Sequence, residues 1–253
     1  MDGILDHTMV RVEDLEASID WYTDHLDWEL KNKSEHSSFT LAFLGPEGMH
    51  EDGAVLELTY NHDGRSYDFG DAWGHIAVRV EDVYEAYDEL MEQGVEDYRD
   101  PESCGGSYAF VRDPDGHEIE IVERDHGARY SIDHTMIRVE DVDEAIGWYS
   151  RKLDYAMTRR SEHDSFSLYF MEPERAPEEA MSMELTYNHD GRSYDFGDAW
   201  GHVAVRAADS DLEEYWEMLM SRHAEEYRDP ESCGYNYAFT KDPDGHEIEI
   251  VRR

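Results

Sequence analysis

The sequence predicts an α+β protein made of four strand–helix–strand–strand units in two tandem domains. Nineteen residues, ELTYNHDGRSYDFGDAWGH, occupy 57–75 and recur letter for letter at 184–202. An identity of this length indicates a duplicated chain. Within each copy, short segments that alternate between apolar and polar residues occur on either side of two helix-like apolar stripes, and this pattern predicts the units.

The repeat also sets the expected domain limits. Matching positions differ by 127 up to His202 and by 129 beyond it, because two residues are added near the helix expected at 209–222. Residues 124–131, RDHGARYS, form the expected linker. The two domains are then 1–123, with units at about 1–69 and 70–123, and 132–253, with units at about 132–196 and 197–253.

The charge of the chain is its most unusual bulk property. It carries 62 acidic against 22 basic residues, a net charge of -40, with 12% aromatic residues. The regular apolar periodicity and the aromatic content argue against disorder. A nucleic-acid partner is excluded because the phosphate backbone would be repelled. We expect a cytosol at molar salt, as in halophilic archaea, where the screening length is about 3 Å.

Location and redox state follow from what the chain lacks. No run of about 18 apolar residues is present, and the N-terminus MDGILDHTMV has no basic region followed by an apolar one. We therefore expect a soluble cytoplasmic protein with no membrane partner. Cys104 and Cys233 lie at matching places, in PESCG each time, and free thiols are expected over a disulfide between them.

The first unit is expected to leave one polar face of its sheet open. Residues 4–12 alternate as a strand, and Asp14 is a plausible N-cap for a helix at 15–26. That helix should cover the Val10 side and leave His7 and Arg11 uncovered. Two further strands are expected at 37–44 and 54–61, with room for a fourth short strand, and the second of them places Glu57 and Asn61 on the open face.

The second unit repeats this plan. Its expected elements are a strand at 74–80 carrying His75, a helix at 82–94 with Gly94 as its C-cap, and strands at 107–112 and 117–123. The tight turn DPDG joins the last two strands, and Glu120 faces away from Ile119. We expect His117 and His246, which follow this turn in the two copies, at the surface as hairpin-end residues. No functional role is expected for His62 and His189 in the polar loop.

Strand alternation therefore places two histidines and two glutamates on the open face in each copy. Two neutral imidazoles and two carboxylates leave a divalent ion nearly neutral, with two positions free for water. This donor set suits Ni²⁺, Co²⁺, Mn²⁺ or Fe²⁺ better than a closed zinc site. The candidate ligands are His7, Glu57, His75 and Glu120 in the first copy and His134, Glu184, His202 and Glu249 in the second.

The words HTMVRV, LELTYN, GHIAVRV and DPDGHEIEIVE resemble glyoxalase I (lactoylglutathione lyase), a family of the vicinal oxygen chelate superfamily, over essentially the whole chain, twice. The resemblance implies βαβββ modules paired into half-barrels with a metal site inside each. It also implies activation by nickel, with Co²⁺, Mn²⁺ and Zn²⁺ as alternatives, because the extra loop segments of zinc-dependent members are missing.

Family members are usually dimers whose sites take two ligands from each subunit. The resemblance therefore implies that this fused chain acts as a monomeric pseudo-dimer with cross-copy sites, although pairing within each copy stays open. Site 1 would contain His7, Glu57, His202 and Glu249, and site 2 would contain His134, Glu184, His75 and Glu120.

The family reaction isomerises the hemithioacetal of methylglyoxal and a thiol to an S-D-lactoyl thioester through an enediolate. The resemblance implies that Glu120 and Glu249 take the proton and that Glu57 and Glu184 serve the other face. The resemblance also implies that four residues bind the γ-glutamyl end of the thiol, namely Arg11, Asn61, Arg138 and Asn188.

This chain departs from the family at the other end of the thiol. Asp71 and Asp198 stand four positions before His75 and His202, where several members have a basic residue, and PESCGG and PESCGY replace the basic residues that hold the glycyl carboxylate. We therefore expect γ-glutamylcysteine as the thiol. The alternatives are another metal enzyme of the fold, such as an acyl-CoA epimerase or an extradiol dioxygenase, or a non-catalytic small-molecule-binding resistance protein.

Overall fold

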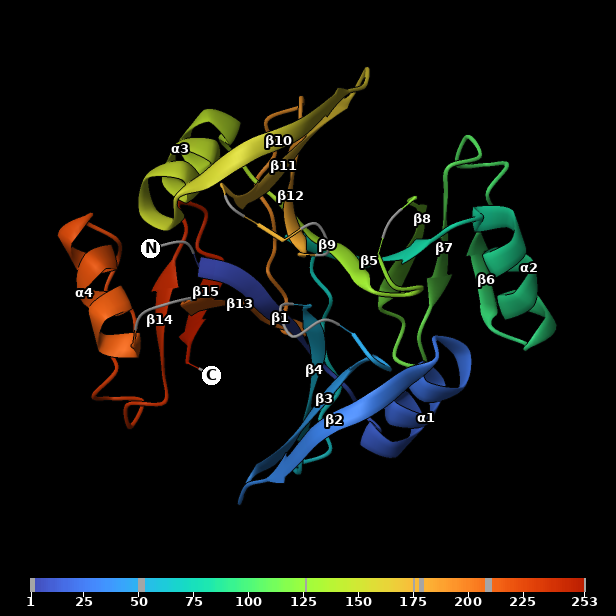
Figure 1. The fold of residues 1–253 in the computed structure, drawn as a ribbon, viewed down its shortest axis with the longest axis horizontal. Coiled ribbons are helices and arrows are strands. Elements are labelled where there is room, and N and C mark those ends of the chain that lie inside the picture. The colour runs from blue at the N-terminus through green and yellow to red at the C-terminus, as the bar shows by residue number, and fades with distance from the viewer. Residues whose placement is uncertain are drawn as a thin grey trace.

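The computed structural model describes residues 3–49, 53–125, 127–174, 176–177, 180–207 and 211–252. Parts of the expected domains and linker, namely residues 1–2, 50–52, 126, 175, 178–179, 208–210 and 253, lie outside the described residues. The described residues form four helices and fifteen strands (Figure 1).

Each quarter of the chain folds as a strand, a helix and then an antiparallel set of strands. Module 1 contains β1 (Gly3–Arg11), α1 (Leu15–His25), β2 (Trp28–Glu35), β3 (Phe39–Pro46) and β4 (Val55–Asn61). Module 2 contains β5 (Trp73–Val80), α2 (Val83–Glu92), β6 (Glu96–Arg99), β7 (Tyr108–Arg112) and β8 (Glu118–Glu123). Module 3 contains β9 (Ile132–Arg138), α3 (Val142–Leu153), β10 (Tyr155–Glu162), β11 (Phe166–Pro173) and β12 (Ser182–Asn188). Module 4 contains β13 (Trp200–Ala207), α4 (Leu212–Ser221), β14 (Tyr237–Lys241) and β15 (Glu247–Val251).

The strands are shared between modules that are far apart in the sequence. One sheet has the order β14-β15-β13-β1-β4-β3-β2, and the other has the order β10-β11-β12-β9-β5-β8-β7-β6. Module 1 therefore shares its sheet with module 4, and module 2 shares its sheet with module 3. The two junctions are antiparallel, β1 with β13 and β5 with β9, and they lie together at the centre of the molecule (Figure 1).

The helices cover the outer sides of the sheets, and their first turns are capped by aspartates. The side chain of Asp14 accepts a hydrogen bond from the backbone N–H of Ala17, as the sequence predicts. The N-caps of the other three helices are Asp82, Asp141 and Asp211. The prediction for Gly94 was wrong by one residue, since Gln93 is the C-cap and Gly94 follows it with φ 85°.

The sequence allowed for a fourth short strand in each module, and three modules contain it, as β2, β6 and β10. Within the described part of module 4, only an isolated bridge between Arg228 and Phe239 takes its place. With that addition the α+β class and its four βαβββ modules are confirmed.

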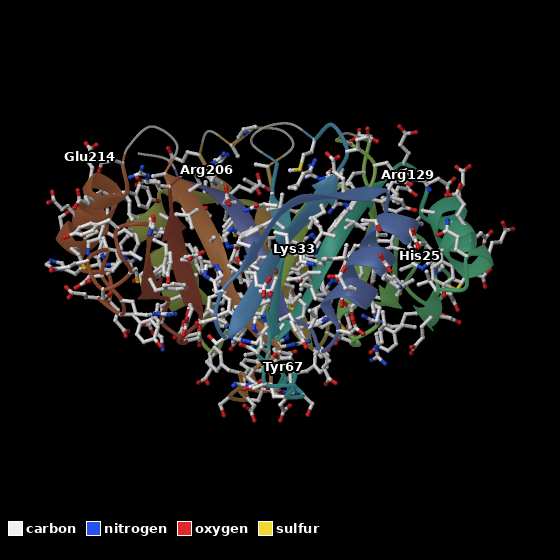
Figure 2. All side chains as sticks on the ribbon, turned by 90° about the horizontal axis from the view of Figure 1, so that it is seen from below. His25, Lys33, Tyr67, Arg129, Arg206 and Glu214 are labelled. Atoms are coloured by element: carbon white, nitrogen blue, oxygen red, sulfur yellow. The ribbon has the colours of Figure 1, made fainter. Side chains whose placement is uncertain are left out.

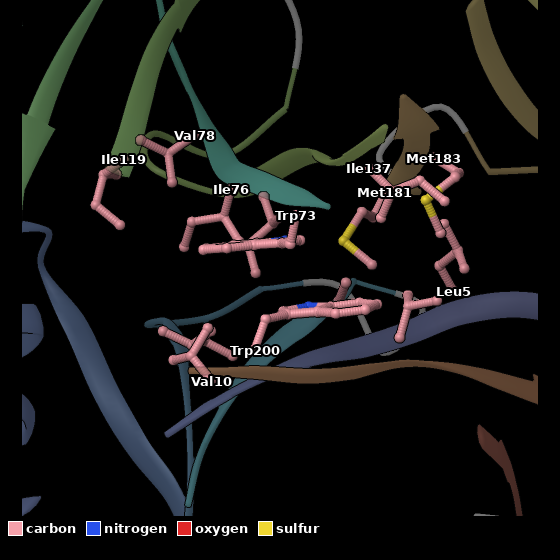
Figure 3. Close-up of a cluster of buried hydrophobic side chains, with 14 of the residues drawn as sticks. Leu5, Val10, Trp73, Ile76, Val78, Ile119, Ile137, Met181, Met183 and Trp200 are labelled. Carbon is pink, nitrogen blue, oxygen red and sulfur yellow. The ribbon is translucent and has the colours of Figure 1, made fainter. Parts of the chain in front are cut away.

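One buried core runs through both sheets. At its centre the indole rings of Trp73 and Trp200 stack with centroids 6.4 Å apart and planes 7° from parallel (Figure 3). Their Nε1–H groups donate to Thr135 and Thr8, each at 3.0 Å, so the only polar atoms of these indoles are satisfied. The stack lies where the two central strand pairs meet, and it joins the two halves of the duplicated chain.

The outer surface is densely charged. Carboxylate-bearing side chains cover the helices, Glu214 on α4 among them, and the loop that carries Tyr67 projects from one side (Figure 2). Among the described residues, no helix is long and apolar enough to cross a membrane. The prediction of free thiols is confirmed, because neither Cys104 nor Cys233 is in a disulfide.

Candidate metal centres

Two clusters of histidine and glutamate lie on the open faces of the sheets, one in each. The first cluster comes from four strands that are neighbours in one sheet, β15, β13, β1 and β4. It contains His7, Glu57, His202 and Glu249. The second cluster comes from β8, β5, β9 and β12, the equivalent neighbours in the other sheet. It contains His75, Glu120 and His134, and Glu184 contacts His134 in turn.

The sheet order explains why the clusters draw on both copies. His7 and Glu57 lie in the sheet of modules 1 and 4, whereas His75 and Glu120 lie in the sheet of modules 2 and 3. A within-copy set of four ligands is therefore divided between two sheets. The arrangement matches the cross-copy sets that the resemblance implies.

In the first cluster, the candidate donor atoms surround a common point. His7 Nε2 lies 3.2 Å from Glu57 Oε2, 3.1 Å from Glu249 Oε2 and 3.2 Å from His202 Nε2. His202 Nε2 is 3.2 Å from Glu249 Oε2 and 3.9 Å from Glu57 Oε2. All four residues are buried.

The second cluster has the same geometry. His134 Nε2 lies 3.0 Å from Glu120 Oε2, 3.1 Å from Glu184 Oε2 and 3.2 Å from His75 Nε2. His75 Nε2 is 3.3 Å from Glu120 Oε2. These residues are also buried.

Both clusters fit a divalent transition-metal ion. Bonds of about 2.1 Å place neighbouring ligand atoms of an octahedron about 3 Å apart, close to the separations observed here. Two imidazole nitrogens that face each other at 3.2 Å cannot both carry a proton without conflict. A cation between them would remove that conflict and neutralise two buried carboxylates. We therefore regard the clusters as candidate metal centres.

A further carboxylate and a hydroxyl orient the candidate ligands. Asp6 lies 3.0 Å from Nδ1 of His7, and Asp133 lies 2.8 Å from Nδ1 of His134. Such a contact fixes the ring so that Nε2 faces the cluster. Thr59 donates to Glu57 at 3.0 Å, and Thr186 donates to Glu184 at 3.0 Å. The sequence analysis did not predict these residues. In the repeated words DHT and ELT, however, the aspartate directly precedes a predicted histidine ligand and the threonine lies two residues after a predicted glutamate ligand.

The buried histidines and glutamates of a cluster shift the pKa values of one another. Burial alone would lower the pKa of His7, but its contacts with Asp6, Glu249 and Glu57 outweigh burial and raise it well above the ordinary range. Burial opposes the ionised form of Glu249, yet His202 and His7 lower its pKa to about 2. An incoming cation must displace the proton that His7 holds, so its affinity falls as the pH falls.

Each histidine packs against the edge of a phenylalanine ring. The centroid distances are 5.5 Å for His7 and Phe43, 5.3 Å for His202 and Phe239, 5.2 Å for His75 and Phe110, and 5.3 Å for His134 and Phe170. The rings form an apolar side of each cluster. The sequence analysis missed them, although they alternate onto the open face in FTLAF, SLYF, SYAF and NYAF.

The residues expected to bind the thiol lie near the clusters. A cavity of about 970 Å³ opens on the first cluster, and Arg11 and Asn61 line it. Arg11 Nη1 donates to the carbonyl oxygens of Asp198 at 2.7 Å and Trp200 at 3.2 Å, and Asn61 donates to the Tyr67 hydroxyl at 2.8 Å. Part of the donor capacity of both side chains is therefore used within the protein.

The other half repeats these contacts. Arg138 Nη1 donates to the carbonyl oxygens of Asp71 at 2.8 Å and Trp73 at 3.1 Å. Asn188 donates to the Tyr194 hydroxyl at 2.8 Å. Arg138 also lines a cavity of about 440 Å³.

The prediction that His117 and His246 are surface residues was wrong, because both are 1% exposed. Nδ1 of His117 lies 3.0 Å from Asp113, whose carboxylate also accepts the backbone N–H groups of Asp115, Gly116 and His117. The hydroxyl of Tyr22 on α1 donates to Asp113 at 3.0 Å. Asp113 and His117 therefore close the DPDG turn and dock it on α1. Sequence alternation alone does not show this docking, because the contact comes from another module.

Comparison with known proteins agrees with this architecture. The model of the Glyoxalase/Bleomycin resistance protein/Dioxygenase superfamily matches residues 4–121 and 131–250, so the chain belongs to that superfamily. The solved structure of glyoxalase I from Zea mays superimposes with a TM-score of 0.86 at 28% identity, covering 99% of this chain and 92% of that one.

Relatives of known name place the chain more narrowly. The lactoylglutathione lyase GLX1 of Arabidopsis thaliana is 32% identical over 209 residues, which are 80% of this chain and 73% of that protein. The lactoylglutathione lyase of Neisseria meningitidis is 44% identical over 126 residues, 48% of this chain and 91% of its own length. Within the superfamily, the chain belongs to the lactoylglutathione lyase (glyoxalase I) family.

Proposed function

We propose that this protein is a metal-dependent glyoxalase I that converts the hemithioacetal of methylglyoxal and a low-molecular-weight thiol into an S-D-lactoyl thioester, and so detoxifies methylglyoxal. The observation that carries the proposal is the pair of buried two-histidine, two-glutamate clusters in a chain of this family. The thiol-binding side chains Arg11 and Asn61 line the cavity that opens on one of them.

In this proposal a divalent ion, Ni²⁺, would be held by the four side chains of each cluster. When bound, such an ion supplies positive charge to the two oxygens of an enediolate. Two neutral imidazoles and two carboxylates are the donors that each cluster would offer such an ion. Co²⁺, Mn²⁺ and Zn²⁺ are the alternatives.

The proton transfer is assigned to the glutamates. Glu249 lies between both histidines of its cluster, at 3.1 and 3.2 Å, and Glu120 lies between both of its own, at 3.0 and 3.3 Å. In the proposal these two carboxylates take the proton from C1 and return it at C2. Glu57 and Glu184, each held by a threonine hydroxyl, serve the opposite face of the substrate.

We also propose γ-glutamylcysteine as the thiol. Arg11 and Arg138 can each fork a carboxylate, which suits the γ-glutamyl end. Asp71 and Asp198 stand where several members carry a basic residue, and the backbone carbonyl oxygen of each accepts a hydrogen bond from one of these arginines. The basic residues that would hold the glycyl carboxylate of glutathione are missing from this chain, and γ-glutamylcysteine lacks that glycine. The fused chain would act alone as a monomer in the cytoplasm, with the thiols of Cys104 and Cys233 reduced.

The test is turnover of methylglyoxal with each thiol in high salt, after reconstitution with Ni²⁺, Co²⁺, Mn²⁺ or Zn²⁺. We expect activity in the wild type, a higher kcat/KM with γ-glutamylcysteine than with glutathione, and no turnover when Glu120→Gln and Glu249→Gln are combined. Absence of turnover with every metal and thiol would remove the proposed function. Full activity of the double variant would remove only the role of these two glutamates.

A further inference from the structure

The four phenylalanines that pack on the cluster histidines differ in what covers their other side. The guanidinium carbon of Arg228 lies 3.8 Å from the centre of the Phe239 ring, in the first cluster. In the second cluster, Arg99 lies 3.8 Å from the Phe110 ring and Arg159 lies 3.6 Å from the Phe170 ring. The fourth ring, Phe43 in the first cluster, has Asn32 as its partner on the neighbouring strand.

The strand register shows that Asn32 occupies the position of Arg159, so the two clusters differ here by a substitution and not by a shifted strand. Asn32 pairs with Phe43 across β2 and β3, as Arg159 pairs with Phe170 across β10 and β11. Both pairs follow a register irregularity at the same place in the strand, so the backbone is equivalent. Over the phenylalanine rings, the second cluster therefore has two arginines and the first has one.

The remaining arginine of the first cluster is neutralised. Arg228 lies 2.7 Å from Glu247, whose counterpart in module 2 is Glu118. Glu118 does not pair with Arg99 but lies 3.7 Å from Arg112. The counterpart of Arg112 in module 4 is Lys241, which contacts the Tyr227 ring at 4.0 Å. The exchange of arginine for lysine at this position thus releases Glu247 to pair with Arg228.

The arginines of the second cluster keep their charge available. Within the described part of the chain, no carboxylate lies within ion-pair distance of Arg99. Arg159 is 4.0 Å from Asp133, but Arg79 and Arg124 already bind that carboxylate at 2.9 Å. The Arg159 side chain remains 44% exposed. In a chain with a net charge of -40, two uncommitted guanidinium groups beside one buried cluster form a local anion-binding surface.

We propose that the two clusters are specialised by the charge of the thiol portion of the substrate. The second cluster selects a hemithioacetal whose thiol carries carboxylates, because Arg99 and Arg159 can each pair with one. The first cluster, with Asn32 and a neutralised Arg228, discriminates less between an anionic thiol and its uncharged ester, because Arg11, which lines its cavity, is matched by Arg138 in the other half. This inference rests on the proposed function for the identity of the substrate, and on the two arginines for the difference between the clusters.

The experiment isolates each cluster in the full chain. Glu249→Gln leaves the second cluster intact, and Glu120→Gln leaves the first intact. For each variant, kcat/KM is measured with the methylglyoxal hemithioacetals of γ-glutamylcysteine and of its dimethyl ester, at one salt concentration. Binding of the unreactive thioether S-methyl-γ-glutamylcysteine and of its dimethyl ester is measured in parallel by calorimetry, which needs no turnover.

We expect the preference for the acid over the ester to be about tenfold greater at the second cluster, the effect of one charge-assisted hydrogen bond. Arg159→Asn should reduce that preference toward the value of the first cluster, and Asn32→Arg should raise the preference of the first. Equal preferences in the two single-cluster proteins, or no change with either substitution, would overturn the inference. If neither protein turns over a hemithioacetal but the thioethers still bind unequally, the proposed function fails and the charge difference stands.

Discussion

A single hydroxyl distinguishes the two copies of the DPDG turn, and adding it to the second copy should stabilise the protein. Asp115 accepts the Glu13 N–H at 2.7 Å on one oxygen and the Ser18 hydroxyl at 3.0 Å on the other. In the second copy, Asp244 accepts the Glu140 N–H at 2.9 Å, but its Oδ2 is buried and has no hydrogen-bond partner among the described residues. The residue that matches Ser18 is Ala145, which is fully buried.

The magnitude and the pH dependence follow from this difference. Burial raises the pKa of Asp244 to about 6. Between the ordinary value of about 4 and pH 6 the folded state binds this proton more tightly than the unfolded state does, so stability falls as the pH rises through that window. Ala145→Ser supplies a donor to the ionised form and lowers the pKa. A hydrogen bond to a charged group is worth about 1.5–3 kcal/mol. Because Asp244 is only partly buried, we expect about 1 kcal/mol.

The assay is urea unfolding of the wild type and Ala145→Ser at pH 8 and pH 4, in the same high salt. The gain should be present at pH 8 and nearly absent at pH 4, where Asp244 is protonated in the folded state of both proteins. Ser18→Ala is the reciprocal control and should destabilise the first copy at pH 8. In an Asp244→Asn background, the effect of Ala145→Ser should lose its pH dependence. A gain of equal size at both pH values, or a loss at pH 8, would refute the reasoning.

Two further perturbations test the surface and the cavity. Thermal unfolding in 0.1 M and 2 M KCl should show a clearly higher midpoint in 2 M, because salt screens the repulsion among 62 acidic residues, and equal midpoints would contradict a halophilic design. Arg11→Ala combined with Arg138→Ala should raise KM for γ-glutamylcysteine hemithioacetal about tenfold or more with a smaller change in kcat, as expected when carboxylate binding is lost. An unchanged KM in that double variant would exclude these arginines from thiol binding.

The fold was predictable because its determinants are local and repeated. Alternation in ELTYN and GHIAVRV shows which side chains share a face, and Asp14 shows where a helix begins. What periodicity could not determine is which strand lies beside which. The antiparallel junction between β1 and β13 joins residues nearly two hundred positions apart, and only the family resemblance indicated that arrangement.

The candidate ligands were predictable for the same reason, whereas their surroundings were not. A glutamate on an open face can be read from alternation, but the carboxylate behind His7 and the ring beside it depend on side-chain directions within the folded sheet. His117 shows the limit most clearly. It lies after a turn, where exposure is the usual expectation, yet Asp113 and an aromatic neighbour, Phe69, enclose it. The burial arises from docking on another module, which no single segment encodes.

The sharing of ligands between the two copies is the central claim, and metal stoichiometry in paired variants tests it most directly. His7→Ala with Glu249→Gln changes two members of the first cluster, and His7→Ala with Glu120→Gln changes one member of each. After reconstitution with Ni²⁺ and removal of free ion, the cross-copy arrangement predicts about two ions bound per wild-type chain, about one in the first variant and nearly none in the second. The reverse order, with one ion retained in the second variant and none in the first, would contradict the arrangement and favour sites formed within each copy.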